Sequence, residues 1–349
     1  MVMRFENTMT GEAQNSRPKL SVFMITYNHE KFIAHALDSV LMQEVNFEYE
    51  IVIGDDLSTD RTREILLRYQ QKYPELIKLI FHETRMGVGG NAYAVLDACK
   101  GDYIALLEGD DYWTSTSKLK QQVAFLEAHS EYTLCFQPVE VYSEEKQQIV
   151  DIQGSVSHRV QTWTLHDVLS DTIPQFPRTC SIVFRASAFE LPAWFPEIIN
   201  GDFVIVALCA TNGDIANLGN CMAVYRLHDH GVWSAGGVLF KLSQAANTRE
   251  HINNHFDYRY ASCFHLNSEY AILAQMYSKA GDHSVALLYL RKALFSKHSN
   301  PAPWNLLVKT ILLVLFPRVH GLLKTLTRFL LRINANAEKA MKITPFKKS

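Results

Sequence analysis

Three carboxylates crowd into one short segment, Glu108-Gly109-Asp110-Asp111, directly after an apolar run at residues 104–107. Like charges held this close together are unfavourable unless a cation relieves the repulsion. Carboxylate oxygens suit a hard divalent ion, and Mg²⁺ or Mn²⁺ would complete its coordination shell with phosphate oxygens and water. We therefore predict a metal site here, with Asp110 as the main ligand and Asp111 as the second. The alternative interpretation is a solvated acidic turn.

A second acidic pair, Asp55-Asp56, ends another β-rich run at residues 49–54. A carboxylate in this position can accept a hydrogen bond from a base or a ribose that lies over the edge of a sheet. On local grounds alone, the stretch at residues 55–58 is more typical of a helix cap or a turn.

A third segment combines Arg85 with Gly87, Gly89, Gly90 and Asn91. We predict a flexible, donor-rich loop before a helix, which would suit a phosphate or a ribose. The segment lacks the lysine-serine ending of a Walker loop, so the sequence does not favour ATP hydrolysis.

Alternating strand and helix patterns space these polar segments along the chain. We predict strands at residues 20–26, 49–54, 77–81 and 103–107, and helices at 31–43, 62–73, 91–99 and 118–129. Alternation of this kind implies a parallel sheet with helices on both faces and ligands at the carboxyl ends of its strands. The polar segments follow those ends. Weaker strand patterns are present at 133–141 and 181–184.

In order along the chain, residues 21–28, 50–62 and 105–113 resemble the motifs of family 2 glycosyltransferases with the GT-A fold, of the type found in bacterial polysaccharide biosynthesis. The resemblance covers roughly the first two thirds of the chain, and several motifs in the right order are more specific than any single match. It implies an inverting transferase that moves a sugar from a UDP-sugar to a saccharide or a polyprenyl-diphosphate-linked acceptor. It also implies Mg²⁺ or Mn²⁺ as cofactor and a product such as O-antigen, capsule or exopolysaccharide.

The resemblance assigns roles to the residues that would contact the donor. Asp56 would read the uracil ring, Asp55 would anchor loops, and Tyr27 would stack on the base. The full set of predicted nucleotide-sugar contacts is Thr26, Tyr27, Asn28, Asp55, Asp56, Arg85, Asn91, Glu108, Asp110 and Arg226. Glu108 occupies the first acidic position of the family's Asp-x-Asp motif, where this chain departs from the pattern.

An inverting transfer needs a general base that takes the proton from the acceptor hydroxyl. The family places an acid at the start of a helix well downstream of the metal motif, and Asp202, which opens the apolar segment to Ala210, matches that position. Its alternative role is to cap the helix. Asp214 is the second candidate for the base.

Residues 225–234 resemble the segment that closes over the donor in this family. The resemblance implies His228 as a metal ligand and Arg226 as a phosphate partner through its forked donors. Without the resemblance, His228 would be interpreted as a structural or surface histidine.

Beyond about residue 238 the pattern changes to long helices. Residues 268–295 predict a helix hairpin broken at Gly281-Asp282 that resembles one tetratricopeptide-type unit. The segment 304–333 is rich in leucine and basic residues, but its apolar run at 311–316 is shorter than the ~20 residues that span a bilayer. It fits a basic helix on an anionic membrane surface, or a helix packed on the catalytic domain or on a partner in a homodimer.

Length and composition set the remaining expectations. A chain of 349 residues has room for a flexible segment at 1–18, a catalytic domain at 19–237 and a helical region at 238–349. Its hydrophobic fraction of 48% and net charge of -2 argue against nucleic acid as a partner. The six cysteines are scattered singly, which excludes common zinc and redox motifs. The amino terminus has no apolar leader pattern, so we expect a cytoplasmic protein, peripheral on the inner face of the plasma membrane.

Two other functions are less consistent with the sequence. A sugar nucleotidyltransferase would have a glycine-rich, basic loop directly after the first strand, where this chain has Tyr27-Asn28-His29-Glu30. A non-catalytic scaffold protein would use its helical end to recruit partners. The sequence favours this function less, because carboxylates are present at the strand ends where a catalytic site would need them.

Overall fold

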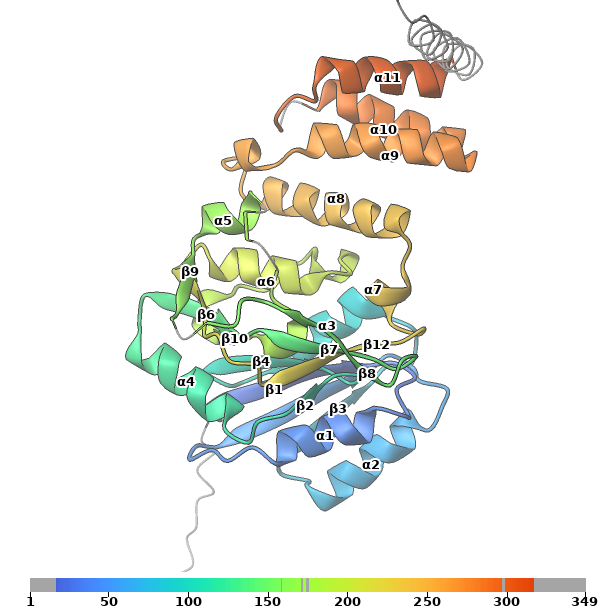
Figure 1. Ribbon diagram of the computed structural model, residues 1–349. Helices are drawn as coiled ribbons and strands as arrows, with labels where there is room; N and C mark the ends of the chain where they lie inside the picture. The colour runs from blue at the N-terminus through green and yellow to red at the C-terminus, as the bar shows by residue number, and fades with distance from the viewer. Residues whose placement is uncertain (1–16, 158, 171, 174–175, 297–298, 317–349) are drawn as a thin grey trace, which may run out of the picture. The chain divides into compact units, whose positions relative to one another are not determined.

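The computed structural model describes residues 17–157, 159–170, 172–173, 176–296 and 299–316 (Figure 1). The chain divides into two compact units, Met1–His228 and Asp229–Ser349. The domain boundary predicted at 237/238 lies slightly further along the chain than this division. Most of the flexible segment predicted at 1–18 lies outside the described residues.

An eight-stranded sheet organises the first unit, in the order β3-β2-β1-β4-β10-β6-β11-β9. Its strands are β1 (Leu20–Thr26), β2 (Tyr49–Asp55), β3 (Ile77–Phe81), β4 (Tyr103–Glu108), β6 (Tyr132–Phe136), β9 (Gln161–Trp163), β10 (Val183–Arg185) and β11 (Asp214–Asn217). Only β9 and β10 run antiparallel to their neighbours in this sheet. The predicted mostly parallel sheet is therefore confirmed.

Two of the weaker strand predictions need correction. The run at 133–141 is split into β6 and β7 (Val139–Ser143), because Pro138 between them has no N–H to donate to a ladder. The strand predicted at 181–184 begins only at Val183, because Thr179–Ser181 form the short 3₁₀ helix η1.

A four-stranded sheet of order β5-β12-β7-β8 lies beside the first and was not predicted. Its other strands are β5 (Tyr112–Trp113), β8 (Gln148–Gln153) and β12 (Ala223–Leu227). The pairing of Val224 with Tyr112 joins the end of the acidic segment to residues more than a hundred positions further along the chain. The segment after β12 is therefore delivered to the acidic loop.

Helices cover both faces of the large sheet, as a parallel sheet requires. They are α1 (Ile33–Leu41), α2 (Thr62–Lys72), α3 (Gly87–Ala98), α4 (Lys118–Ala128), α5 (Leu165–Leu169) and α6 (Gly201–Cys209), with the 3₁₀ helices η2 (Ala186–Ala188) and η3 (Phe195–Glu197). In Figure 1, α1, α2 and α4 lie on one face, and α3 and α6 lie on the other. One core cluster joins Ile33 of α1, Leu66 of α2 and Val123 of α4 to Val22 and Met24 of β1.

Helix α3 begins at Gly87, whose φ is 73°, so Gly89 and Gly90 of the predicted flexible loop are helical instead. Glycine is a weak helix former, but here tertiary packing outweighs that preference. A Cβ at Gly89 would lie 2.3 Å from the carbonyl oxygen of Ile198, so glycine permits the close approach of the chain at η3.

The second unit is helical in its described part. It contains α7 (Val232–Ala235), α8 (Val238–His255), the 3₁₀ helix η4 (Ala261–Cys263), α9 (Leu266–Ala280), α10 (His283–Phe295) and α11 (Trp304–Leu315). Gly281, with φ of 89°, ends α9, and the Asp282 carboxylate caps α10. The predicted break at Gly281-Asp282 coincides with this turn, whereas the tetratricopeptide likeness stays a prediction.

Helix α11 packs on α9 and α10 through the buried residues Thr310, Leu313 and Val314. The rest of the predicted basic tail, residues 317–333, lies outside the described residues. Within the described part of the chain, no helix has both the length and the apolar character needed to cross a membrane.

Candidate active site

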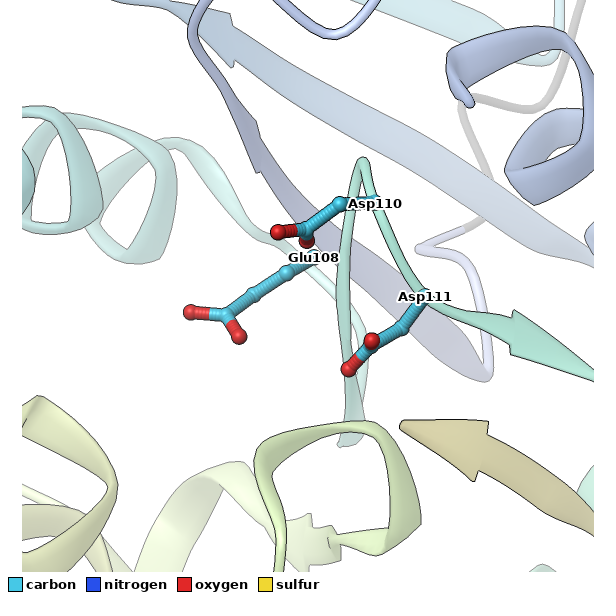
Figure 2. Close-up of side chains that lie close together, drawn as sticks. All are labelled: Glu108, Asp110 and Asp111. Atoms are coloured by element: carbon cyan, nitrogen blue, oxygen red, sulfur yellow. The ribbon is translucent and has the colours of Figure 1, made fainter. Parts of the chain in front are cut away.

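Glu108, Asp110 and Asp111 meet in the loop that leaves the carboxyl end of β4 (Figure 2). One ligand oxygen from each carboxylate lies within 4.8 Å of the others. The loop is tight because the Gly109 amide donates to Ile25 on β1 and the Asp111 amide donates to Glu108. A Cβ at Gly109 would lie 2.9 Å from Thr26 Oγ1, so glycine allows the loop to press against β1.

Two oxygens of this cluster, Asp110 Oδ1 and Asp111 Oδ2, are buried without a hydrogen-bond partner among the described residues. A buried carboxylate oxygen without a partner costs free energy, and a divalent cation would satisfy both at once. The donor set of the site therefore fits a cation such as Mg²⁺ or Mn²⁺.

The charge states follow from burial and crowding. Burial, together with the charge of Asp110, raises the pKa values of Glu108 and Asp111 well above their usual range. Burial acts in the same direction on Asp110, but His29 and His228 outweigh it and hold the pKa of that carboxyl below its usual value. In the absence of a cation, the cluster thus concentrates its negative charge on Asp110.

Two histidines approach Asp110 from different elements. His228, which follows β12, places its Nε2 at 2.9 Å from Asp110 Oδ2. His29, in the loop after β1, places its Nε2 at 3.7 Å from the same oxygen. Burial lowers the pKa of His29 and favours its neutral form. The structure brings the predicted ligand His228 to the acidic loop.

His29 was missed from the sequence. It lies beside Tyr27 and Asn28, which the sequence did single out, and it shares their place after a parallel strand. The same strand-end argument could therefore have found it.

Asp55 and Asp56 have distinct surroundings at the end of β2. Asp55 accepts hydrogen bonds from the Ser58 amide and the Arg63 side chain, which matches its predicted role as a loop anchor. Asp56 accepts from the backbone amides of Met86 and Gly87 at 2.6 and 3.1 Å. Asp56 thus caps the start of α3, which is the alternative role that the local sequence favoured.

The predicted base-binding residues lie together around Asp56. The Arg85 guanidinium lies 3.4 Å from the centroid of the Tyr27 ring, and its Nε donates to Asp56 at 3.0 Å. The side chain of Asn28 accepts from the Thr59 amide, and Thr26 Oγ1 is buried without a partner among the described residues. Arg85 therefore covers one face of the Tyr27 ring, the residue predicted to stack on the base.

Two residues predicted to contact the donor are bonded to other parts of the protein. Asn91 is buried at 2% exposure, and its amide bonds to His82 and to the Gly54 carbonyl, so it packs α3 on β2 and is not presented to a ligand. The Arg226 guanidinium bonds to Glu144 and His35 through its terminal nitrogens, and its Nε is buried without a partner among the described residues. Its contact with a phosphate stays a prediction. What Arg226 contributes to the loop is its backbone amide, which donates to Asp111 Oδ1 at 2.8 Å.

Asp202 lies in the first turn of α6, one position after the first helical residue. Its carboxylate accepts from the Phe203 amide at 2.8 Å, and its charge raises the pKa of Glu108, which places the two acids near each other. Burial raises the pKa of Asp202 itself, against the opposing effects of Arg178 and Thr179. Sequence reasoning missed both of these neighbours.

Asp214, the second candidate for the base, is at the wrong edge of the sheet. It begins β11, which runs parallel to β6 and in the same direction as β4. The acidic cluster lies at the carboxyl end of β4, so Asp214 lies at the opposite edge.

Comparisons with known proteins show which family this chain resembles. Residues 21–190 match the family model described as Glycosyl transferase family 2. An uncharacterized protein of Mycobacterium tuberculosis is 38% identical over 218 residues, which cover 61% of this chain and 60% of that protein. An uncharacterized glycosyltransferase of Nostoc is 30% identical over 222 residues, or 60% of this chain and 65% of that protein. The chain thus spans less than two thirds of these relatives.

Similarity to solved structures identifies the fold. The crystal structure of TarS from Staphylococcus aureus has a TM-score of 0.57 at 19% identity, covering 87% of this chain and 53% of that one. Residues 1–349 of TarS in complex with UDP-GlcNAc give a TM-score of 0.54 at 18% identity, covering 86% of this chain and 88% of that one. The match over residues 21–190 is thus to glycosyl transferase family 2, and the chain shares the GT-A fold of TarS.

Proposed function

We propose that this protein is an inverting glycosyltransferase that moves a sugar from a UDP-sugar to an acceptor hydroxyl. The observation that carries the proposal is the meeting of Glu108, Asp110 and Asp111 within 4.8 Å at one strand end, with Asp202 close enough to perturb Glu108. TarS, which shares the fold, has been solved with UDP-GlcNAc, and this supports a uridine nucleotide as donor.

The cation proposal follows from the donor set. Asp110, Asp111 and His228 would hold the ion, and two of their carboxylate oxygens have no other partner in the described part of the chain. A bound Mg²⁺ or Mn²⁺ would stabilise the negative charge that develops on the departing diphosphate. The backbone amide of Arg226 orients Asp111 for this purpose.

Asp202 is the proposed general base. A carboxyl whose pKa is raised by burial is a better proton acceptor near neutral pH than an exposed aspartate. It would take the proton of the acceptor hydroxyl while that oxygen bonds to the anomeric carbon and the bond from this carbon to UDP breaks. Thr179 and Arg178 would hold the Asp202 carboxylate during this step.

The nucleoside would bind over Tyr27 and Asp56. Because Arg85 covers the Tyr27 ring and bonds to Asp56, a stacking base would displace the guanidinium or bind against its outer side. Asp56 would keep its bonds to α3 and offer its remaining capacity to the base.

The proposed acceptor is a class of molecules and not a single compound. A saccharide or polyprenyl-diphosphate-linked acceptor in cell-surface polysaccharide synthesis is supported by TarS, a poly(ribitol-phosphate) β-N-acetylglucosaminyltransferase that is 35% identical over 113 residues, 32% of this chain and 19% of TarS. On α11, Trp304 is 75% exposed, which supports contact with a membrane surface or with a second copy of the chain.

A panel of nucleotide sugars separates the candidate functions. We expect UDP-sugars to bind and to release UDP in the presence of Mn²⁺ or Mg²⁺, with loss of turnover but not of binding in Asp202→Asn. Formation of a nucleotide sugar from a nucleoside triphosphate and a sugar phosphate would instead identify a nucleotidyltransferase. Failure to bind any nucleotide in calorimetry would favour the scaffold.

A further inference from the structure

The loop after β1 brings a second imidazole to the acidic cluster. We propose that His29 is a direct ligand of the divalent cation, in addition to Asp110, Asp111 and His228. This inference rests on the proposed function, because it concerns the cation of the same site.

The separation of His29 from Asp110 suits a shared ion better than a hydrogen bond. The distance of 3.7 Å from His29 Nε2 to Asp110 Oδ2 exceeds hydrogen-bond range. Two ligands that each bind one ion at about 2.1 Å are about 3.0 Å apart at a right angle and about 4.2 Å apart when opposite. The observed distance lies between these limits, so an ion can bind both atoms with little movement.

Ligands from three separate elements surround this position. His29 comes from the loop after β1, Asp110 from the loop after β4, and His228 from the end of β12. The two imidazole rings are edge to face, with centroids 6.1 Å apart. His228 already reaches Asp110 Oδ2 at 2.9 Å, whereas Asp110 Oδ1 has no partner in the described part of the chain. Both imidazoles therefore approach Asp110 Oδ2, while Asp110 Oδ1 is left for an ion.

The loop that carries His29 is fixed without help from an ion. The amides of Asn28 and His29 donate to Ser58 Oγ and Thr62 Oγ1 at 2.9 and 2.8 Å. In return, the Thr59 amide donates to Asn28 Oδ1. The carbonyl of His29 accepts the amide at the start of α1. A ligand on so constrained a backbone is preorganised, which favours a direct bond to the ion over a chance approach.

An imidazole in the coordination shell changes which ion the site prefers. Mg²⁺ takes oxygen ligands, whereas imidazole nitrogen suits transition ions. A second histidine should therefore strengthen binding of Mn²⁺ more than binding of Mg²⁺, so ion selectivity reports on His29.

The test measures Mn²⁺ and Mg²⁺ binding to the full chain in the presence of UDP, by calorimetry, without a transfer assay. We expect His29→Ala to weaken Mn²⁺ binding about tenfold or more, with a smaller effect on Mg²⁺. His29→Gln keeps a polar side chain of similar length and should show the same loss of selectivity. His166→Ala, which removes an exposed histidine, is the matched control and should bind both ions normally.

Pulsed electron paramagnetic resonance of bound Mn²⁺ detects coordinated nitrogen directly. A nitrogen signal should persist in His228→Ala, where His29 would be its source, and should vanish when both histidines are replaced. Loss of the signal in His228→Ala alone would overturn the proposal, as would wild-type Mn²⁺ affinity in folded His29→Ala and His29→Gln. If the wild-type chain binds no Mn²⁺ with UDP, the proposed cation itself fails. If the wild type binds Mn²⁺ and the two His29 variants bind it equally well, only the role of His29 as a ligand is rejected.

Discussion

Lys118 allows a sharp test of how the first unit tolerates buried charge. This lysine at the start of α4 is fully buried, at 0% exposure. Its Nζ donates to Gln122 at 2.6 Å and lies 4.4 Å from the centroid of the Trp113 ring. No carboxylate in the described part of the chain forms an ion pair with it. Burial accordingly lowers the pKa of Lys118 from 10.5 to about 7.

The lowered pKa sets the size and direction of the effect. A fall from 10.5 to about 7 corresponds to about 5 kcal/mol, since one pKa unit is about 1.4 kcal/mol. Between these two values the unfolded chain holds the proton and the folded chain releases it. The free energy of unfolding should therefore rise with pH through this window, by up to about 1.4 kcal/mol per unit. The stability gained above pH 7 is lost again as the pH falls to 7. Below pH 7 Lys118 is protonated in both states, so it no longer makes the free energy of unfolding depend on pH.

Lys118→Met removes the charge and keeps most of the side-chain volume. The variant loses the bond to Gln122 and the contact with Trp113, together about 2 kcal/mol. Near pH 7 we therefore expect a net gain in the free energy of unfolding of about 3 kcal/mol, which should turn into a net loss of about 1 kcal/mol near pH 10.

Urea unfolding near pH 7 and near pH 9.5, followed by intrinsic fluorescence, measures this difference. Lys120→Met, on the exposed side of α4, is the control and should leave both stability and its pH dependence unchanged. The second unit is identical in all variants, so its contribution cancels in the comparison. The reasoning is refuted if Lys118→Met is less stable than the wild type by the same amount at both pH values.

Three further predictions concern the site. Chelation should abolish UDP release and Mn²⁺ or Mg²⁺ should restore it, so full activity in excess chelator would exclude the proposed cation. Asp56→Ala should weaken UDP binding and also cost about 1 kcal/mol of stability, because Asp56 caps α3; unchanged UDP affinity in calorimetry would move the base-reading role elsewhere. Asp202→Asn should lower turnover by roughly 10²-fold at an unchanged melting temperature, whereas Asp214→Asn should retain it. Near-normal turnover in Asp202→Asn would show that another group is the base.

The strand-end clusters could be predicted because their causes are local. Short β-rich runs alternate with amphipathic helices, and in a parallel sheet the carboxyl ends of strands share one edge. Asp55 at the end of β2 and Glu108 at the end of β4 follow from this rule, without any knowledge of the intervening helices.

The remaining features depend on contacts between distant parts of the chain. The approach of His228 to Asp110 requires β12 to pair with β5, and two-residue β5 has no strand signal of its own. The early start of α3 requires Gly89 to pack against η3. The cap that Asp56 provides joins β2 to α3, which is not the next helix after β2 in the sequence.

The strand order explains how a single donor could reach both halves of the site. Strand β1 lies between β2 and β4, with Thr26 opposite Asp55 on one side and Ile25 opposite Glu108 on the other. The order of the strands reverses at this point, which opens a crevice at their carboxyl ends. Asp56 and the acidic loop are thus about two strand spacings apart, or about 10 Å. With the base over β2 and the diphosphate over β4, the ribose would lie above the end of β1. Thr26 Oγ1, buried there without a partner among the described residues, is the hydroxyl that we expect it to meet.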